Sequence, residues 1–130
     1  MDLLVDTNIL LAAILNEPEK GRIVELTAEA KLVAPEIMPY EIGNALSAMM
    51  KRHRLTQEQV QISFKLFETI PVHLEQVNIA DALGLSYRFG IYAYDAYYLE
   101  VALRLHIPLL TLDRQMKSIG HSLKIKLLEV

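Results

Sequence analysis

The chain has 130 residues, a net charge of -3, no cysteine and an apolar fraction of 52%, which together predict one domain over residues 1–130 with a buried core. This composition excludes a disordered chain, a disulfide-stapled scaffold, a thiolate metal site and a cysteine nucleophile. The longest apolar run, from Ile9 to Leu15, is too short to span a membrane and follows no basic segment typical of a signal peptide, so we expect a cytoplasmic protein.

Apolar runs of strand length alternate with helical patterns along the chain. The clearest helix starts at Pro39, where apolar residues recur at intervals of three and four up to Met50 and lead into a basic segment. A capping box opens the next helix, because Gln59 follows Thr56 three positions later. In chain order, the patterns predict a strand at 3–5, helices at 9–15 and 18–30, a strand at 31–34, helices at 39–54 and 56–69, a strand at 71–74, helices at 78–89 and 94–105, a strand at 108–112, a short helix and a strand at 125–128.

This alternation favours an α/β fold with a mostly parallel central sheet and helices on both faces. In such sheets, ligands bind outside the carboxyl ends of the strands. Asp6 follows the first strand and Asp113 follows the strand at 108–112, so a parallel sheet would bring both carboxylates to one edge. Taken singly, each is better explained as the N-cap of the helix that follows it.

Two further acids lie on predicted helices. Glu41 lies at the margin of an apolar stripe, where a solvated side chain is the alternative. The helix at 94–105 is apolar except for Glu100 and Arg104, an i, i+4 pair that we take to mark its solvent side. Asp95 points about 140° away from Glu100, so we expect it to face inward, where a carboxylate is costly unless it binds a metal or free backbone N–H groups.

Four carboxylates at one site would repel one another unless a cation lies among them. Oxygen donors select hard divalent ions, which makes Mg²⁺ or Mn²⁺ the expected cofactor. Zinc is disfavoured, because the chain has no cysteine and its four histidines lack ligand spacing. An ion held by carboxylates is typical of enzymes that activate water for phosphoryl transfer, such as nucleases.

Four segments resemble the motifs of the PIN-domain family, in family order and over essentially the whole chain. They are LLVDTNIL at 3–10, PYEIGNAL at 39–46, YDAYYL at 94–99 and LTLD at 110–113. By its small size the chain is also similar to the VapC toxins of type II toxin–antitoxin pairs. The resemblance implies a three-layer α/β/α sandwich whose acidic pocket holds Mg²⁺ or Mn²⁺ and cleaves single-stranded or structured RNA. It also implies homodimerisation and a VapB-like antitoxin that inserts into or covers the pocket.

The family's functional residues carry over position by position. The four acids that match the catalytic and metal-binding positions are Asp6, Glu41, Asp95 and Asp113, of which the last matches a more variable position. Supporting positions match at Thr7, Asn8, Thr111 and Asn44. The helical wheel, however, turns Asn44 away from the apolar stripe of its helix.

Basic and aromatic residues suggest contacts beyond the acids. Arg114 and Lys117 closely follow Asp113 and are the first candidate contact to the RNA backbone, with solvated surface residues as the alternative. Some relatives carry a further acid just past the fourth, which this chain lacks, so the number of metal ions stays open. The second candidate RNA contact is a patch of Lys51, Arg52 and Arg54, which is alternatively the cationic end of a helix. Aromatic residues from 87 to 94 favour an interface, and the helix at 56–69 either forms the antitoxin groove or packs inward.

The resulting hypothesis is a metal-dependent endoribonuclease, the toxin of a toxin–antitoxin pair, whose products carry a 5′-phosphate. The alternative is an RNA-processing nuclease of the same family without an antitoxin. A phospho-receiver domain is disfavoured, because the first strand ends in a single Asp and the region of the third offers Glu75 but no Asp. The net charge does not oppose an RNA substrate: of 16 acidic residues, the four at the site leave 12 against 13 basic ones.

Overall fold

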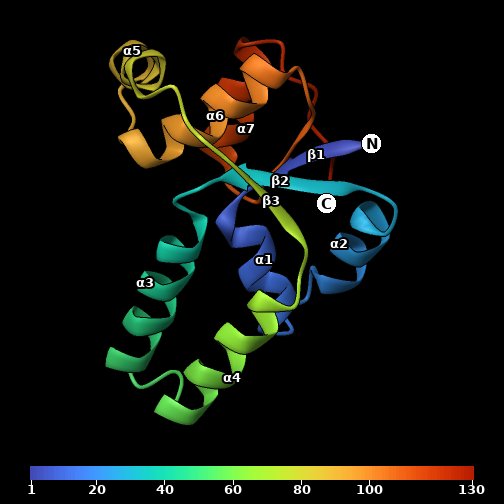
Figure 1. The fold of residues 1–130 in the computed structure, drawn as a ribbon, viewed down its shortest axis with the longest axis vertical. Helices are drawn as coiled ribbons and strands as arrows, with labels where there is room; N and C mark the ends of the chain where they lie inside the picture. The colour runs from blue at the N-terminus through green and yellow to red at the C-terminus, as the bar shows by residue number, and fades with distance from the viewer.

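A four-stranded parallel sheet runs through the middle of the molecule in the computed structural model, which describes all 130 residues (Figure 1). The strands are β1 (Asp2–Val5), β2 (Lys31–Pro35), β3 (Val72–Glu75) and β4 (Leu109–Leu110), in the order β3-β2-β1-β4. The helices are α1 (Thr7–Ile14), α2 (Lys20–Thr27), α3 (Met38–Lys51), α4 (Gln57–Glu68), α5 (Ile79–Phe89), α6 (Ala93–Leu105) and α7 (Arg114–Ser122). The predicted parallel α/β class is confirmed.

The helices form two layers on opposite sides of the sheet. In Figure 1, α1 to α4 lie on one side and α5 to α7 lie on the other, where α6 packs against β1 and β2. The three layers match the α/β/α sandwich that the resemblance implies. No helix combines the length and the apolar character that crossing a membrane would require.

The sheet buries its central strand completely. Leu3, Leu4 and Val5 of β1 have no solvent exposure, and they belong to one hydrophobic core that includes both helical layers. A parallel strand that is covered on both faces has apolar residues at consecutive positions, which explains why apolar and polar residues do not alternate along β1. Because β2 and β4 flank β1 in parallel, the carboxyl ends of these three strands meet at one edge of the sheet.

Two predicted elements differ from the structure. The strand expected at 125–128 is wrong, because this segment makes only an isolated parallel bridge between Leu127 and Leu109. The physical reason is that β4 ends at Leu110 and the chain then turns toward α7, which leaves little edge to pair with. The second helix starts at Lys20, later than expected, because Pro18 lies in the turn before it.

Candidate active site

Asp6 occupies the first position after β1 and is 9% exposed. Its Oδ1 accepts a hydrogen bond of 2.8 Å from the backbone N–H of Thr7, at the start of α1. Its Oδ2 accepts bonds of 2.7 Å from Thr111 Oγ1 and 3.1 Å from Asn8 Nδ2. The carboxylate therefore caps a helix, as the simpler interpretation predicts, and is also fixed in place by two side chains of the predicted supporting set.

Asp113 follows β4 and lies at the same edge of the sheet as Asp6. The two are linked through Thr111, whose hydroxyl donates to Asp6 and accepts a 3.0 Å bond from the backbone N–H of Asp113. The strand pairing brings them together, because the N–H of Asp6 donates to the carbonyl of Leu110 at 3.0 Å. Asp113 also caps α7 by accepting from the N–H of Met116 at 3.0 Å.

Glu41 lies in the first turn of α3, half-buried, and is held by a residue that sequence analysis did not predict. The hydroxyl of Tyr98, a buried residue of α6, donates to Glu41 Oε1 at 2.7 Å and lies 2.7 Å from Thr7 Oγ1. Since a phenol has one proton, Thr7 must donate to Tyr98 when Tyr98 donates to Glu41. Burial, followed by the charge of Glu41, raises the pKa of Tyr98 above its ordinary value, which keeps this donor protonated. The only sequence signal was its position three residues after Asp95, which equally suits a core aromatic residue.

Asp95 lies in the first turn of α6 and is half-buried beside the other acids. Burial, and then the negative charge of Asp113, raises the pKa of its carboxyl. The charge of Asp95 in turn acts on both Asp6 and Glu41. The structure thus brings the four predicted acids together, although they come from positions 6, 41, 95 and 113 of the chain.

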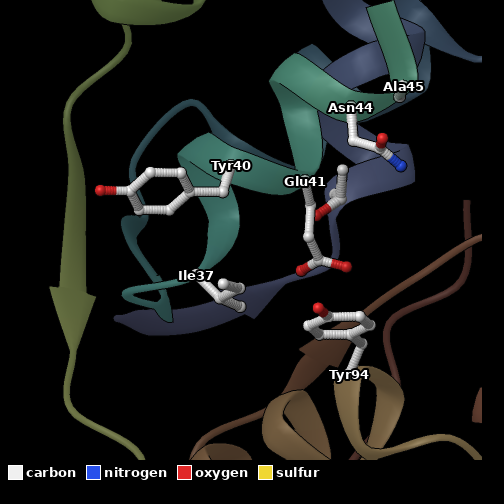
Figure 2. Close-up of a pocket in the computed structure, with 7 residues that line it drawn as sticks. Ile37, Tyr40, Glu41, Asn44, Ala45 and Tyr94 are labelled. Atoms are coloured by element: carbon white, nitrogen blue, oxygen red, sulfur yellow. The ribbon is translucent and has the colours of Figure 1, made fainter. Parts of the chain in front are cut away.

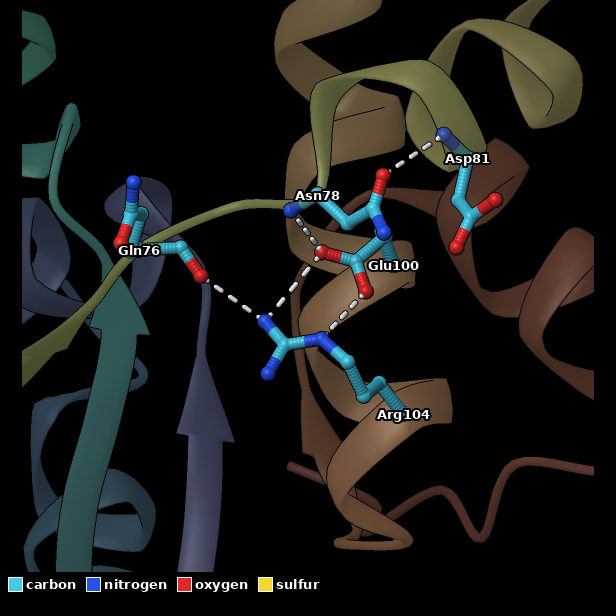
Figure 3. A network of polar contacts seen from close by, with 5 residues as sticks. All are labelled: Gln76, Asn78, Asp81, Glu100 and Arg104. Atoms are coloured by element: carbon cyan, nitrogen blue, oxygen red, sulfur yellow. Dashed lines mark hydrogen bonds and ion pairs between the residues drawn. The ribbon is translucent and has the colours of Figure 1, made fainter.

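The reasoning that led to Asp95 contained one wrong step. Glu100 does not mark the solvent side of α6 but is 3% exposed, because α5 and the segment before it cover that face. Figure 3 shows its carboxylate accepting from the backbone N–H of Asn78 and from Arg104, both at 2.7 Å. Arg104 also donates to the carbonyl of Gln76 at 2.8 Å. The pair is therefore a structural anchor for the chain between β3 and α5.

The site collects negative charge without a cationic partner. Burial and the neighbouring charges of Asp95 and Asp113 raise the pKa of Asp6 to about 6, despite the hydrogen bonds that oppose this change. Burial also raises the pKa of Glu41. All ion pairs lie elsewhere, between Arg22 and Glu25, His73 and Glu75, Arg104 and Glu100, and Lys117 and Glu129.

These residues fit a hard divalent cation in their chemistry. The donors are carboxylate oxygens, their charge is uncompensated, and no histidine or cysteine contributes. As the side chains are arranged here, no three Asp, Glu or His residues converge closely enough to ligate one ion.

A pocket of about 400 Å³ opens beside Glu41 and Thr7 (Figure 2). Its remaining lining residues are Ile37, Tyr40, Asn44, Ala45 and Tyr94. Asn44 is exposed and follows Glu41 by one helical turn, so its position away from the apolar stripe places it at the pocket instead of in the core. Sequence analysis assigned no role to Tyr40.

The predicted basic residues divide into two groups. Arg114 is exposed directly after Asp113, and Lys117 lies 3.7 Å from Glu129. The patch of Lys51, Arg52 and Arg54 lies at the far end of α3, which extends away from the sheet in Figure 1. From Glu41 to Lys51 the helix rises about 15 Å, so the structure does not bring this patch to the acids.

Helix α4 turns its aromatic residues inward. Phe67 is buried, and Val60 and Phe64 pack against the core, so these three do not form an exposed groove. The exposed apolar side chains of this helix are instead Ile62 and Leu66.

Comparisons with known proteins give one consistent family. The PIN domain model matches residues 3–122. Ribonuclease VapC3 of Pyrobaculum aerophilum is 27% identical over 121 residues, which cover 89% of this chain and 92% of that protein. The crystal structure of VapBC2 from Rickettsia felis, bound to a DNA fragment from their promoter, has a TM-score of 0.70 at 18% identity and covers 98% of both chains. Mycobacterium tuberculosis VapC20, described as a Sarcin-Ricin loop cleaving toxin, has a TM-score of 0.64 at 16% identity over 91% of this chain and 95% of that one.

Proposed function

Because this chain belongs to the PIN domain family, we propose that it is a metal-dependent endoribonuclease and the toxin of a toxin–antitoxin pair. Its substrate is single-stranded RNA, in which it hydrolyses phosphodiester bonds and leaves a 5′-phosphate. Its relatives support this proposal, since they include Ribonuclease VapC3 of Pyrobaculum aerophilum.

The observation that carries the proposal is the uncompensated charge at the carboxyl edge of the sheet. Four acids meet there without a cationic partner, and the pKa of three of them is raised. A protein that used these residues only for stability would pair them or cap helices with them. Asp6 and Asp113 do cap helices, but Glu41 and Asp95 receive no such explanation.

Asp6 and Asp95 would hold Mg²⁺ or Mn²⁺ directly, and Glu41 and Asp113 directly or through water. When bound, such an ion supplies a polarised water for in-line attack and offsets charge on the departing 3′ oxygen. The residues of the chain supply orientation. Thr111 and Asn8 hold one oxygen of Asp6.

On the opposite wall of the site, Tyr98 fixes one oxygen of Glu41, which leaves the other oxygen free to face the pocket. Arg114, exposed beside Asp113, can neutralise an adjacent phosphate of the RNA.

The decisive experiment for this function is cleavage of single-stranded RNA by the purified chain in Mg²⁺ and in Mn²⁺. We expect cleavage that EDTA abolishes and that Asp6→Asn and Asp95→Asn each reduce by at least about a hundredfold. Asp2→Asn is the matched control, because Asp2 lies exposed at the start of β1, whereas Asp6 directly follows the end of this strand. Full activity of either site variant in EDTA would refute the proposal.

A cytoplasmic location of the chain, an antitoxin of the VapB type and a homodimer are part of the same proposal. Solved structures of this fold include a toxin–antitoxin complex, and exposed apolar residues on α5 form a stripe of Ile79, Leu83 and Tyr87 that suits a second chain. Light scattering of the purified chain tests the dimer. Coexpression with the product of a small adjacent reading frame tests the antitoxin, which must suppress cleavage. A monomer that no neighbouring gene product inhibits would instead favour the stand-alone processing nuclease.

A further inference from the structure

Two of the four acids are directly preceded in the chain by an exposed tyrosine. Tyr40 precedes Glu41 in the first turn of α3, and Tyr94 precedes Asp95 in the first turn of α6. Their side chains are 76% and 56% exposed, although tyrosine is a residue that folding normally covers more fully. Both line the pocket beside Glu41. Aromatic surface is therefore presented next to the acids and is not used by the core.

Tyr94 forms one wall of this pocket. In Figure 2 its ring lies across from the Glu41 carboxylate, while the ring of Tyr40 points outward. Tyr97 holds the Tyr94 ring in an edge contact, with ring centroids 5.9 Å apart and planes at 83°. The ring is thus oriented by its neighbour before any ligand arrives, which lowers the entropic cost of using it as a binding surface.

The pocket continues into a second, more apolar hollow of about 560 Å³. The two share Ile37, Tyr40 and Tyr94, and the second adds Val77 and Ile79 among its apolar lining residues. One hollow is therefore polar at Glu41 and Asn44, and the other is apolar except for Glu36, with the tyrosines lining both. A ligand that fits this arrangement has a flat uncharged face and a polar edge.

A nucleobase has both properties, and the neighbouring charges restrict which part of an RNA can enter. The carboxylate of Glu41 repels a phosphate but not a neutral base. Stacking on an aromatic side chain is the usual way in which proteins bind unpaired bases, and it is unavailable to a base inside a duplex. Asn44 presents an exposed amide at the same pocket, and an amide can both donate to and accept from a base edge.

We propose that this pocket binds one unpaired nucleobase of the substrate, next to the cleaved phosphodiester, with the base stacked on Tyr94 and its edge contacted by Asn44. The inference rests on the proposed ribonuclease function and adds to it a reason for the preference for single strands. A base that is paired in a duplex cannot reach Tyr94 without leaving its stack.

The first test measures RNA affinity separately from cleavage. A fluorescein-labelled single-stranded RNA of mixed sequence is titrated with the Asp6→Asn chain in Mg²⁺, and fluorescence anisotropy is recorded. We expect Tyr94→Leu, which retains apolar bulk, to weaken binding by about tenfold, and Tyr94→Phe, which retains the ring, to change it by less than about twofold. Val24→Ala is the control, because Val24 is an exposed apolar residue of α2 that lines neither hollow. Equal weakening by Tyr94→Leu and Val24→Ala would overturn the proposal.

The second test removes the base instead of the ring. Abasic nucleotides are placed in turn on each side of the cleaved bond. One of these abasic RNAs should bind the chain with Tyr94 about tenfold more weakly than the intact RNA does. The same RNA should bind Tyr94→Leu as tightly as the intact RNA does. Losses that multiply at every position would overturn the stacking contact.

The outcomes separate this proposal from the proposed function. If the wild-type chain cleaves RNA but Tyr94→Leu leaves RNA affinity unchanged, the base pocket is overturned and the proposed function is not. If RNA affinity depends on Tyr94 but the wild-type chain cleaves no RNA, the base pocket is supported and the proposed ribonuclease function is overturned. Light scattering of each variant tests whether the pocket binds a protein instead of a base. If Tyr94→Leu changes the oligomeric state and leaves RNA affinity unchanged, the pocket binds another chain and the proposal is wrong.

Discussion

Replacing Asp6 with asparagine should stabilise the metal-free chain at neutral pH while it removes cleavage. Burial raises the pKa of Asp6 in the folded chain to about 6, against its ordinary value of 3.8. The folded state therefore binds this proton more tightly than the unfolded state, and the free energy of unfolding falls as the pH rises between these two values. Above about pH 6 the folded chain bears the whole cost of ionising the buried Asp6. The difference between the two pKa values corresponds to about 3 kcal/mol.

The asparagine side chain keeps only part of the hydrogen bonding. Its oxygen can accept from the N–H of Thr7, but its nitrogen cannot accept from Asn8 or from the hydroxyl of Thr111. The loss of these two bonds costs about 2 kcal/mol, so we expect a net gain of about 1 kcal/mol at pH 7.5.

Urea unfolding in EDTA measures this difference at pH 7.5 and again near pH 4, with Asp2→Asn as the control. Near pH 4 the wild-type carboxyl of Asp6 is almost fully protonated in the folded chain and about 40% protonated in the unfolded one. The remaining cost of ionisation is then only about 0.5 kcal/mol, so the gain should vanish. Added Mg²⁺ should raise the stability of the wild-type chain but not that of Asp6→Asn. The reasoning is refuted if Asp6→Asn is no more stable than wild type at pH 7.5 in EDTA.

Three further variants test other parts of the structure. Tyr98→Phe should lower cleavage by about tenfold through a less ordered Glu41, and it should lower stability by only about 1 kcal/mol, as measured by RNA turnover and urea unfolding; an unchanged turnover would contradict the positioning role. Thr111→Val should reduce Mn²⁺ affinity, measured by calorimetry, by about tenfold or more, because outer contacts to a metal ligand typically contribute that much; equal affinity would show that its bond to Asp6 is dispensable. Glu100→Ala should lower the free energy of unfolding by about 2 to 4 kcal/mol, because it leaves the N–H of Asn78 without its partner; cleavage per folded molecule should stay at the wild-type level, and its loss would place this residue in the site.

The edge of the sheet that carries the site was predictable because it depends on local features. Asp6 and Asp113 each follow a short apolar run, and a parallel sheet necessarily brings such positions together. Thr111 and Asn8 were predicted only through the family resemblance, since hydrogen bonds between residues about a hundred positions apart leave no periodic signal. Glu41 was recognisable by its position at the margin of an apolar stripe.

Two features of the structure depend on tertiary packing and were not predicted from the sequence pattern. The pattern of α6 predicts an exposed Glu100, yet α5 covers that face, and the buried carboxylate is satisfied by Arg104 and a backbone N–H. The role of Tyr98 was hidden for the opposite reason, because a tyrosine in an apolar helix looks like core until its hydroxyl is seen to reach Glu41. The residue types of the site were thus predictable, whereas the burial of a helix face by segments distant in the chain was not.

The strand order also has a consequence for how the protein is made. The last strand to be synthesised, β4, pairs with the first, β1, which lies at the centre of the sheet between β4 and β2. A growing chain therefore exposes an open edge of β1 beside Asp6 until residue 110 has emerged from the ribosome, and this late, long-range pairing is the slow kind of folding step. A chain that stops before residue 113 lacks both that strand and the fourth acid. Truncated products would lack part of the site, so the proposed cleavage requires that nearly all of the domain has been synthesised.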